Sequence, residues 1–318
     1  MTDSVINSSR DREICRRLEQ IRVCYELGDL QKNAEDPEAI ASYYRASDFY
    51  YNAVHSRGGH AIHMGLSKDG LFRHEDLFAQ AEFVAEQMTP ETRSVLELGA
   101  GKAANTKYLA PRFSDVSFTA LDLPDRNFLR TRVPDNVRLV EGDYHDLSCF
   151  AASSFDLVFA VETICHSDRK GTVYREVARV LRPGGRLIVF DVFEPKPISE
   201  MSVFERDVDA VVLGSMCVTE RNQWIGDTVL FLEKSGFSGI AVSDLTDQIQ
   251  PSLKRLERYA EQWFTHGKAR RLFRKLINEK ASRTSIAGWL MPLCFDGIDL
   301  LQYNRVVAVK DGLAGTGS

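Results

Sequence analysis

A strand that runs directly into a glycine turn and then a helix constrains the fold of this chain more than any other feature. Residues 95–104 read Val-Leu-Glu-Leu-Gly-Ala-Gly-Lys-Ala-Ala. Gly99 and Gly101 permit a tight turn and let the backbone approach a ligand, and Glu97 brings a carboxylate to the same place. In α/β proteins, nucleotide-like ligands bind where such a strand meets its helix. The run therefore predicts a nucleotide-type site, and its carboxylate suits a ligand with positive charge.

The sequence around this run predicts a parallel sheet. Short apolar or β-branched runs alternate with helical stretches, which is the pattern of βαβ units. The predicted strands are 94–98, 117–122, 137–141, 155–161, 186–193, 238–243 and 304–310. Helices are expected at 103–112 and 170–181, and the turn at 182–185, Arg-Pro-Gly-Gly, leads into the fifth strand.

Helical segments flank this core on both sides. Helical spacing covers 10–55 and 77–88, and the chain after Pro197 is mostly helical. The predicted division is a helical lid or substrate-binding segment at 1–90, a cofactor-binding core at 91–195, the rest of the core with helical insertions at 196–313, and a tail at 314–318. Insertions at these places lie over the strand ends, where they commonly form a substrate lid.

The composition of the chain limits the kinds of molecule that it is expected to bind. The 318 residues carry a formal net charge of -5 and no long Lys/Arg block, which gives no electrostatic footprint for nucleic acid. A small-molecule substrate is therefore expected. The chain starts with a polar segment and has no apolar run near the roughly 18 residues of a membrane span, so a cytoplasmic protein without stable membrane insertion is predicted. Its six cysteines lack a C-x-x-C pair and are expected to be reduced thiols. The oligomeric state stays open, and a homo-oligomer is one alternative.

Acidic residues follow successive predicted strands. Asp122, with Leu123 after it, ends the second strand about twenty residues beyond the glycines, where a carboxylate can accept both ribose hydroxyls of a nucleotide. Asp143 and Tyr144 follow the third strand and offer an acceptor for an adenine amino group and a flat ring. A lone Asp in such a turn is more often solvated or a helix cap. Together with Glu97, these residues place three carboxylates on one edge of the sheet, which favours a ligand site.

Two cofactors fit the glycine turn. Gly99-x-Gly101-x-x-Ala104 matches the dinucleotide fingerprint, which by itself is a weak signal. A short-chain oxidoreductase would need a Tyr-x-x-x-Lys pair, and none of the ten tyrosines has a lysine four residues on. The balance favours S-adenosylmethionine, whose amino group suits Glu97, and leaves a nicotinamide oxidoreductase as a distant alternative.

The chain at this point resembles the class I S-adenosylmethionine-dependent methyltransferases. Residues 97–101 look like the family's first motif, with Ala103 where a third glycine is common. Asp122 and Asp143 match the acidic residues after the second and third strands, and 155–159 and 176–185 are similar to the fourth strand and the signature after the next helix. The resemblance covers about 90–195 and implies a Rossmann-like α/β fold with a seven-stranded, mostly parallel sheet and helices on both faces. It implies S-adenosylmethionine as cofactor, bound by Glu97, Gly99, Gly101, Asp122, Leu123, Asp143, Tyr144 and Val161.

Two segments resemble enzymes that methylate carbon. Residues 161–168, Val-Glu-Thr-Ile-Cys-His-Ser-Asp, are similar to the Glu-Ala-x-Cys-His-Ala-Pro signature of sterol C-methyltransferases, with Ser167 and Asp168 in place of Ala-Pro. The aromatic segment 43–65 resembles a region of those enzymes and of prenyl diphosphate C-methyltransferases. The resemblance implies methylation of an alkene carbon in an isoprenoid or terpenoid-bearing natural product.

The chemistry of that reaction needs these residue types. Methyl transfer to an alkene creates a carbocation, so the site needs π faces to stabilise it and a base to remove a proton. A cation can also shift a hydride or cyclise before proton loss. The catalytic candidates are Glu162, His166 and Tyr51. The substrate-binding candidates are Tyr43, Tyr44, Tyr50, His63 and, for a diphosphate, Arg206.

Plainer interpretations stand beside each of these. Clustered aromatics are more often core, Glu162 is as readily a capping carboxylate, and Arg206 more often lies on a solvated helix face. His60-x-x-His63 lacks an acidic or cysteine partner at ligand spacing, so no metal is predicted. The alternative functions are an O- or N-methyltransferase of a small secondary metabolite and a non-catalytic cofactor-binding regulator.

Overall fold

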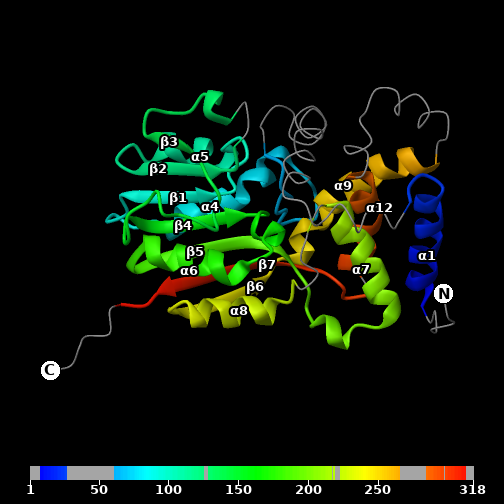
Figure 1. Cartoon of the computed structure of the whole chain (residues 1–318). Helices are drawn as coiled ribbons and strands as arrows, with labels where there is room; N and C mark the ends of the chain where they lie inside the picture. The colour runs from blue at the N-terminus through cyan, green and yellow to red at the C-terminus, as the bar shows by residue number, and fades with distance from the viewer. Residues whose placement is uncertain are drawn as a thin grey trace.

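A seven-stranded sheet forms the centre of the protein (Figure 1). The computed structural model describes residues 8–26, 61–124, 128–216, 218, 223–265, 284–296 and 298–312. The strand order is β3-β2-β1-β4-β5-β7-β6. The strands are β1 Ser94–Leu98, β2 Ser117–Asp122, β3 Val137–Glu141, β4 Phe155–Val161, β5 Leu181–Phe193, β6 Phe237–Asp244 and β7 Gln302–Lys310. Strands β1 to β5 pair in parallel, and β7 runs antiparallel to β5 and β6. The predicted Rossmann-like methyltransferase fold is confirmed.

The apolar runs form central strands because both faces of the sheet are covered. Val95, Leu96 and Leu98 of β1 are fully buried, although successive side chains of a strand point to opposite faces. A strand buried on both sides needs a continuous apolar run rather than alternation. Burial on both faces thus explains the apolar residues at successive positions of β1.

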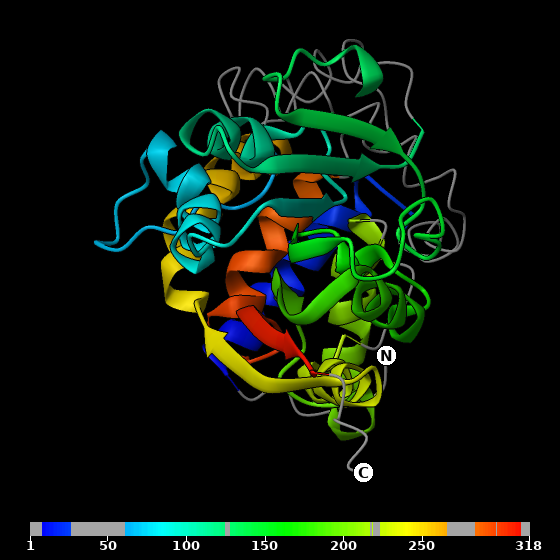
Figure 2. The same cartoon turned by 90° about the vertical axis from the view of Figure 1, so that its left-hand side faces the viewer.

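Helices cover the two faces of the sheet (Figure 2). Helices α4 Ala79–Gln87 and α5 Ala104–Leu109 contact each other on one side, and α6 Lys170–Val180 and α8 Ile225–Lys234 contact each other on the other. The ring of Phe83 on α4 packs edge-on against Phe190 of β5, with 5.8 Å between ring centroids. Tyr174 of α6 belongs to the core cluster on the opposite face, with Leu96 and Val158.

Some element boundaries differ from the prediction. Strand β5 begins at Leu181, so the expected turn at 182–185 lies inside an irregular strand whose register against β4 shifts between Phe155 and Leu157. Helix α5 ends at Leu109 and continues as a 3-10 turn, Ala110–Arg112, because Pro111 cannot donate the α-helical hydrogen bond. Strands β6 and β7 are slightly longer than expected.

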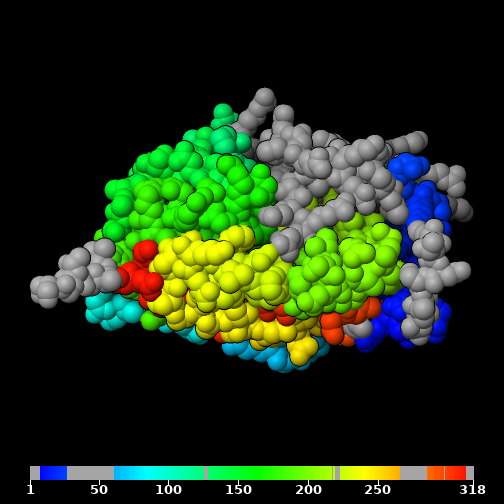
Figure 3. Space-filling view, turned by 60° about the horizontal axis from the view of Figure 1, so that its bottom comes forward, coloured from blue at the N-terminus to red at the C-terminus, as the bar shows by residue number. Residues whose placement is uncertain are grey.

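A group of helices lies beyond the carboxyl ends of the parallel strands (Figure 1). Helices α1 Ser9–Arg22, α7 Val203–Ser215, α9 Thr246–Thr265 and α12 Thr284–Phe295 come from both ends of the chain. Helix α12 contacts α1, α7 and α9, and buried Trp263, Trp289 and Met291 join the helices to the core. Figure 3 shows α7 and α8 next to each other on the surface, with α1 at the end of the molecule remote from β7's carboxyl end.

Arg17 connects α1 to the rest of this helical group. Its guanidinium contacts Glu13 at 2.9 Å and Glu257 of α9 at 2.6 Å. It donates to the carbonyl oxygen of Trp289 on α12 at 2.6 Å and lies over that residue's ring, 4.1 Å from the centroid. Arg17 is 8% exposed, so these contacts are largely shielded from solvent.

We expect Arg17→Ala to loosen α1 specifically. Removing a buried, stacked guanidinium costs about 2 kcal/mol or more, because packing and ion pairing are both lost. Hydrogen exchange of the α1 amides should accelerate correspondingly. Arg22→Ala, on the same helix, removes an exposed ion pair with Glu19. It should change the free energy of opening of the α1 amides by less than about 0.5 kcal/mol. Equal effects of the two variants would contradict this role of Arg17.

Candidate active site

The turn after β1 is built from left-handed residues. Gly99, Gly101 and Ala103 have φ values of 58°, 57° and 54°. Glycine adopts this conformation without strain, whereas Ala103 does so at a cost of about 1–2 kcal/mol. The amide of Gly101 donates to the Asp122 carboxylate at 2.5 Å, and the Ala100 amide donates to the Leu121 carbonyl at 3.0 Å. The end of β2 thus fixes the turn after β1.

The two glycines have different surroundings. A Cβ atom on Gly99 would lie 1.9 Å from Oγ1 of Thr163, in the loop after β4, so only glycine fits there. Among the described residues, a Cβ on Gly101 would meet only Ile62, at 3.9 Å. Gly99 therefore permits a close contact between two loops, and the described residues leave space at Gly101 in which a ligand can approach the backbone.

Glu97 is buried at the end of β1 and faces the first turn of α5. Its carboxylate accepts hydrogen bonds from the Thr106 hydroxyl at 2.5 Å, the Thr106 amide at 3.2 Å and Asn105 Nδ2 at 3.2 Å. Burial raises its pKa to about 7, against the effect of these donors. The structure thus gives Glu97 a helix-capping role; its contact with a cofactor amino group stays a prediction.

His63 belongs to the same network. Its Nε2 lies 3.3 Å from Oδ1 of Asn105, and its Nδ1 lies 3.2 Å from the carbonyl oxygen of Met64. Burial lowers the pKa of the imidazole. The ring is 6% exposed, so it supports the loop around Met64, and its predicted contact with substrate stays a prediction.

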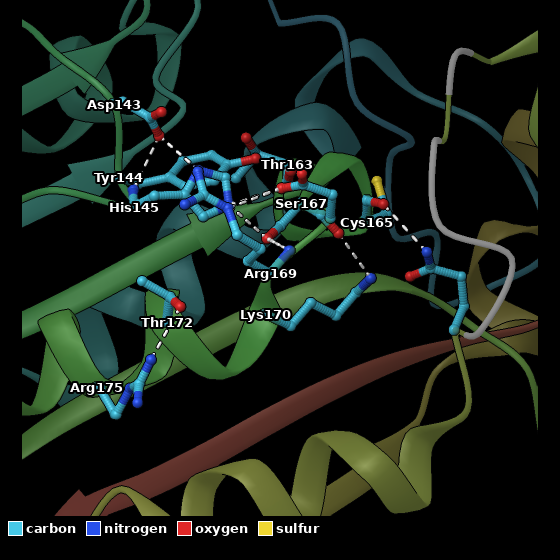
Figure 4. Close-up of polar contacts among 12 residues, drawn as sticks. Asp143, Tyr144, His145, Thr163, Cys165, Ser167, Arg169, Lys170, Thr172 and Arg175 are labelled. Atoms are coloured by element: carbon cyan, nitrogen blue, oxygen red, sulfur yellow. Dashed lines mark hydrogen bonds and ion pairs between the residues drawn. The ribbon is translucent and has the colours of Figure 1, made fainter. Parts of the chain in front are cut away.

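The residues after β3 contact the loop after β4 (Figure 4). Tyr144 donates from its hydroxyl to the carbonyl oxygen of Thr163 at 3.2 Å, and burial raises its pKa well above the usual value. Asp143 is half-exposed and accepts from the backbone amide of His145 at 2.8 Å. The predicted adenine-side residues therefore lie beside the loop that contains Glu162.

Glu162 follows β4 in a left-handed conformation, with φ of 48°. Oε1 of its carboxylate accepts from the Met64 amide at 2.8 Å and from the Tyr303 hydroxyl at 2.9 Å. Gln80 on α4 supports both donors, because its Nε2 contacts the Met64 carbonyl at 2.7 Å and the Tyr303 hydroxyl at 3.2 Å. A non-glycine residue with positive φ held by three elements is typical of a functional site.

The pKa of the Glu162 carboxyl group is raised into the range near neutral pH. Burial raises its pKa to about 8, and the nearby negative charge of Asp191 adds to the increase. Asp191, near the end of β5, is 1% exposed, and burial also raises its pKa. The hydrogen bonds from Met64 and Tyr303 act in the opposite direction, since they stabilise the carboxylate.

The remaining predicted residues fall into three groups. Val161 is buried, Leu123 is 36% exposed beside Asp122, and half-buried His166 donates its backbone amide to the Thr163 carbonyl at 3.2 Å. Arg206 on α7 donates to the Met201 carbonyl at 2.8 Å. Tyr43, Tyr44, Tyr50 and Tyr51 lie outside the described residues.

Tyr303 and Gln80 are site residues that the sequence did not suggest. Tyr303 lies at the start of the last strand, which pairs antiparallel with β5 and so begins at the edge where β4 ends. Only the strand order brings it to Glu162. Gln80, within a short helix before the core, carries no motif that signals its position.

Neither a metal-binding cluster nor a membrane-spanning helix occurs among the described residues. That part of the chain contains no cluster of three or more His, Cys, Asp or Glu side chains that could hold a metal ion. Within the same ranges, none of the helices has the length and hydropathy that a membrane crossing requires.

Comparison with known proteins identifies the core. Residues 96–189 match a family model described as a methyltransferase domain. A glycine/sarcosine/dimethylglycine N-methyltransferase of Actinopolyspora halophila is 32% identical over 52% of this chain and 30% of its own length. A sterol 24-C-methyltransferase of Debaryomyces hansenii is 30% identical over 52% of this chain and 46% of its own. The chain thus spans less than half the length of both relatives.

A solved structure shares the fold over most of the chain. The geranyl diphosphate C-methyltransferase of Streptomyces coelicolor A3(2), in complex with Mg2+, geranyl diphosphate and S-adenosyl-L-homocysteine, superposes with a TM-score of 0.61. It is 16% identical and covers 86% of this chain and 98% of its own. At that identity, the likeness shows the fold alone.

We expect Gly99→Ala to disrupt the site. The new Cβ must displace Thr163 and adopt a left-handed backbone, so the free energy of unfolding should fall by about 3 kcal/mol or more. Gly184→Ala is the matched control: its φ is 78°, but no described residue lies within 4 Å of a Cβ there, so a loss of only about 1–2 kcal/mol is expected. Urea unfolding followed by tryptophan fluorescence measures both. A Thr163→Gly replacement should recover part of the Gly99→Ala loss, and no recovery would show that this contact is not the cause.

Proposed function

Because the chain belongs to the class I S-adenosylmethionine-dependent methyltransferases, we propose that it methylates an alkene carbon of an isoprenoid or terpenoid-bearing small molecule. The observation that carries the proposal is the carboxyl group of Glu162, held by Tyr303 and the Met64 amide beside the glycine turn. The proposal draws further support from the sterol 24-C-methyltransferase relative.

The residues around the glycine turn fit S-adenosylmethionine. The described residues leave space next to the Gly101 backbone, Asp122 offers a carboxylate for ribose hydroxyls, and exposed Leu123 offers an apolar surface for a base. The cofactor supplies an electrophilic methyl group on a positively charged sulfur. Asp122 and Gly101 are already hydrogen-bonded to each other, so little reorganisation is needed to present this surface.

In the proposed reaction, a carbon–carbon bond forms between the alkene and the methyl group while the sulfur–methyl bond breaks. The positive charge moves to the neighbouring substrate carbon, and loss of a proton from an adjacent carbon restores an alkene. We assign that proton to Oε2 of Glu162, because the two donors found among the described residues, the Met64 amide and the Tyr303 hydroxyl, contact Oε1. A base with a pKa near the working pH is well matched to proton removal. The growing cation also favours the ionised form of Glu162.

An N-methyltransferase is the second candidate function. One specific observation favours it, namely the 32% identity to an enzyme named for N-methylation of glycine derivatives. An amine substrate needs only a positioned base and generates no carbocation. N-methylation therefore accounts less well for the two hydrogen bonds that hold the Glu162 carboxyl group.

The identity of the methylated atom tests the proposal directly. The protein is incubated with S-adenosylmethionine carrying a 13C-methyl group and a panel of a sterol, a prenyl diphosphate, a prenylated alkaloid and simple amines and phenols. The 13C chemical shift of the new methyl group distinguishes carbon from nitrogen or oxygen attachment. We expect a carbon-bound methyl from an isoprenoid substrate, and methylation of nitrogen or oxygen alone would overturn the proposal.

We expect Glu162→Gln to abolish most turnover and to spare cofactor binding. Gln preserves the acceptor oxygen for Met64 and Tyr303 but cannot take a proton, so kcat should fall roughly 10²- to 10⁴-fold. The dissociation constant of S-adenosylhomocysteine, measured by calorimetry, should stay within about threefold, or 0.6 kcal/mol. Glu91→Gln, at the opposite edge of the sheet, is the control and should leave both quantities unchanged. Unchanged turnover in Glu162→Gln removes Glu162 from the mechanism.

The pH dependence of turnover provides an independent check. The base is active when ionised, so kcat should rise with pH through the pKa of about 8. Tyr303→Phe removes a donor that stabilises the carboxylate, which should raise that pKa and move the rising limb to higher pH by roughly one unit. A pH profile that Tyr303→Phe leaves in place, or moves to lower pH, would contradict the assignment.

A further inference from the structure

The chain departs from the sterol C-methyltransferase signature at its last two positions, and both of these residues lie beside one histidine. Ser167 and Asp168 stand where that signature has Ala-Pro. In the structure, Ser167 Oγ lies 2.7 Å from Nε2 of His145, and Oδ1 of Asp168 lies 3.5 Å from the same nitrogen. Figure 4 shows His145 between Asp143 and Ser167. Ser167 and Asp168, in the loop after β4, thus contact His145 in the loop after β3.

His145 also binds the carboxylate expected to face the cofactor. Its Nδ1 lies 2.7 Å from Oδ1 of Asp143, and that same oxygen accepts from the His145 backbone amide at 2.8 Å. A carboxylate only accepts, so Nδ1 carries the proton in the neutral ring and Nε2 is left as an acceptor for the Ser167 hydroxyl. The hydrogen bonds therefore define one direction, from Ser167 through His145 to Asp143.

Burial makes this arrangement rigid at one end and open at the other. Ser167 is fully buried, and its Oγ also accepts from the Arg169 amide at 3.1 Å. The Lys170 ammonium donates to the Ser167 carbonyl at 3.0 Å, which further fixes the loop. The His145 side chain is 12% exposed, whereas that of Asp143 is 48% exposed. A fixed serine thus orients a shielded imidazole, which in turn holds an accessible carboxylate.

We propose that His145 is a positioning residue for cofactor recognition: it holds Oδ1 of Asp143 so that Oδ2 accepts the exocyclic amino group of adenine. Through Ser167, it also ties that carboxylate to the loop that begins at Glu162. The inference rests on the proposed binding of S-adenosylmethionine, with Asp143 beside adenine as the sequence predicts, and it does not depend on the substrate that is methylated.

The test compares two ligands that differ at one edge of the purine ring. S-adenosylhomocysteine carries the amino group, and S-inosylhomocysteine carries an oxygen in its place and a proton on the neighbouring N1. Losing a hydrogen bond to a charged acceptor is worth roughly a tenfold change in affinity or more. We expect the wild-type protein to prefer the adenine ligand by about that factor in calorimetry.

Three variants at one position separate the two contacts of the imidazole. His145→Ala should bring the preference to within about twofold, with little change in affinity for S-inosylhomocysteine. His145→Asn keeps a donor close to the place of Nδ1 and should retain most of the preference. His145→Gln, which extends toward Ser167 and lacks a donor near the place of Nδ1, should lose the preference for the adenine ligand. Affinity for S-inosylhomocysteine also reports that each variant is folded.

Each outcome decides the inference. A His145→Ala variant that keeps the wild-type preference, or that weakens both ligands equally, shows that the imidazole only supports the loop and overturns the proposal. A wild-type protein without any preference shows that Asp143 does not face adenine, which overturns both the inference and that cofactor assignment. Failure of carbon methylation leaves these binding results unaffected, so the two failures are distinguishable.

Discussion

The contact between Gly99 and Thr163 is the constraint on which the site depends. Because Gly99 has no side chain, the turn after β1 and the loop after β4 come within van der Waals distance. The same loop bears Glu162 and receives the Tyr144 hydroxyl at the Thr163 carbonyl. Residues after three strands are thereby held against one another. A single Cβ at position 99 would separate the cofactor turn from the proposed base.

Buried acidic groups set the electrostatic character of this edge. Glu97, Glu162 and Asp191 lie near the carboxyl ends of three adjacent strands, and burial raises the pKa of each. Uncompensated negative charge in such a place is costly, and a positively charged ligand offsets that cost. The edge therefore suits a sulfonium cofactor and a cation formed on the substrate better than it suits a pyrophosphate.

The sequence predicted the sheet and the cofactor turn because both depend on local patterns. Continuous apolar runs mark strands buried on two faces, and left-handed positions select glycine at 99 and 101. Tyr303, Gln80 and Ser167 were not recognised, since their roles come from the antiparallel last strand and from contacts between distant loops. Glu97 shows the opposite case: its motif is clear, yet its hydrogen bonds go to Thr106 and Asn105.

The position of α1 has a consequence for how the chain is made. Arg17, near the beginning, contacts Glu257 and Trp289, which follow about 240 and 270 residues later. During synthesis, most of the sheet can pair before either partner has left the ribosome, whereas α1 lacks these two partners until α9 and then α12 emerge. The helical group over the strand ends is therefore completed late in synthesis, as is the ligand edge, because β7 and its Tyr303 follow α12.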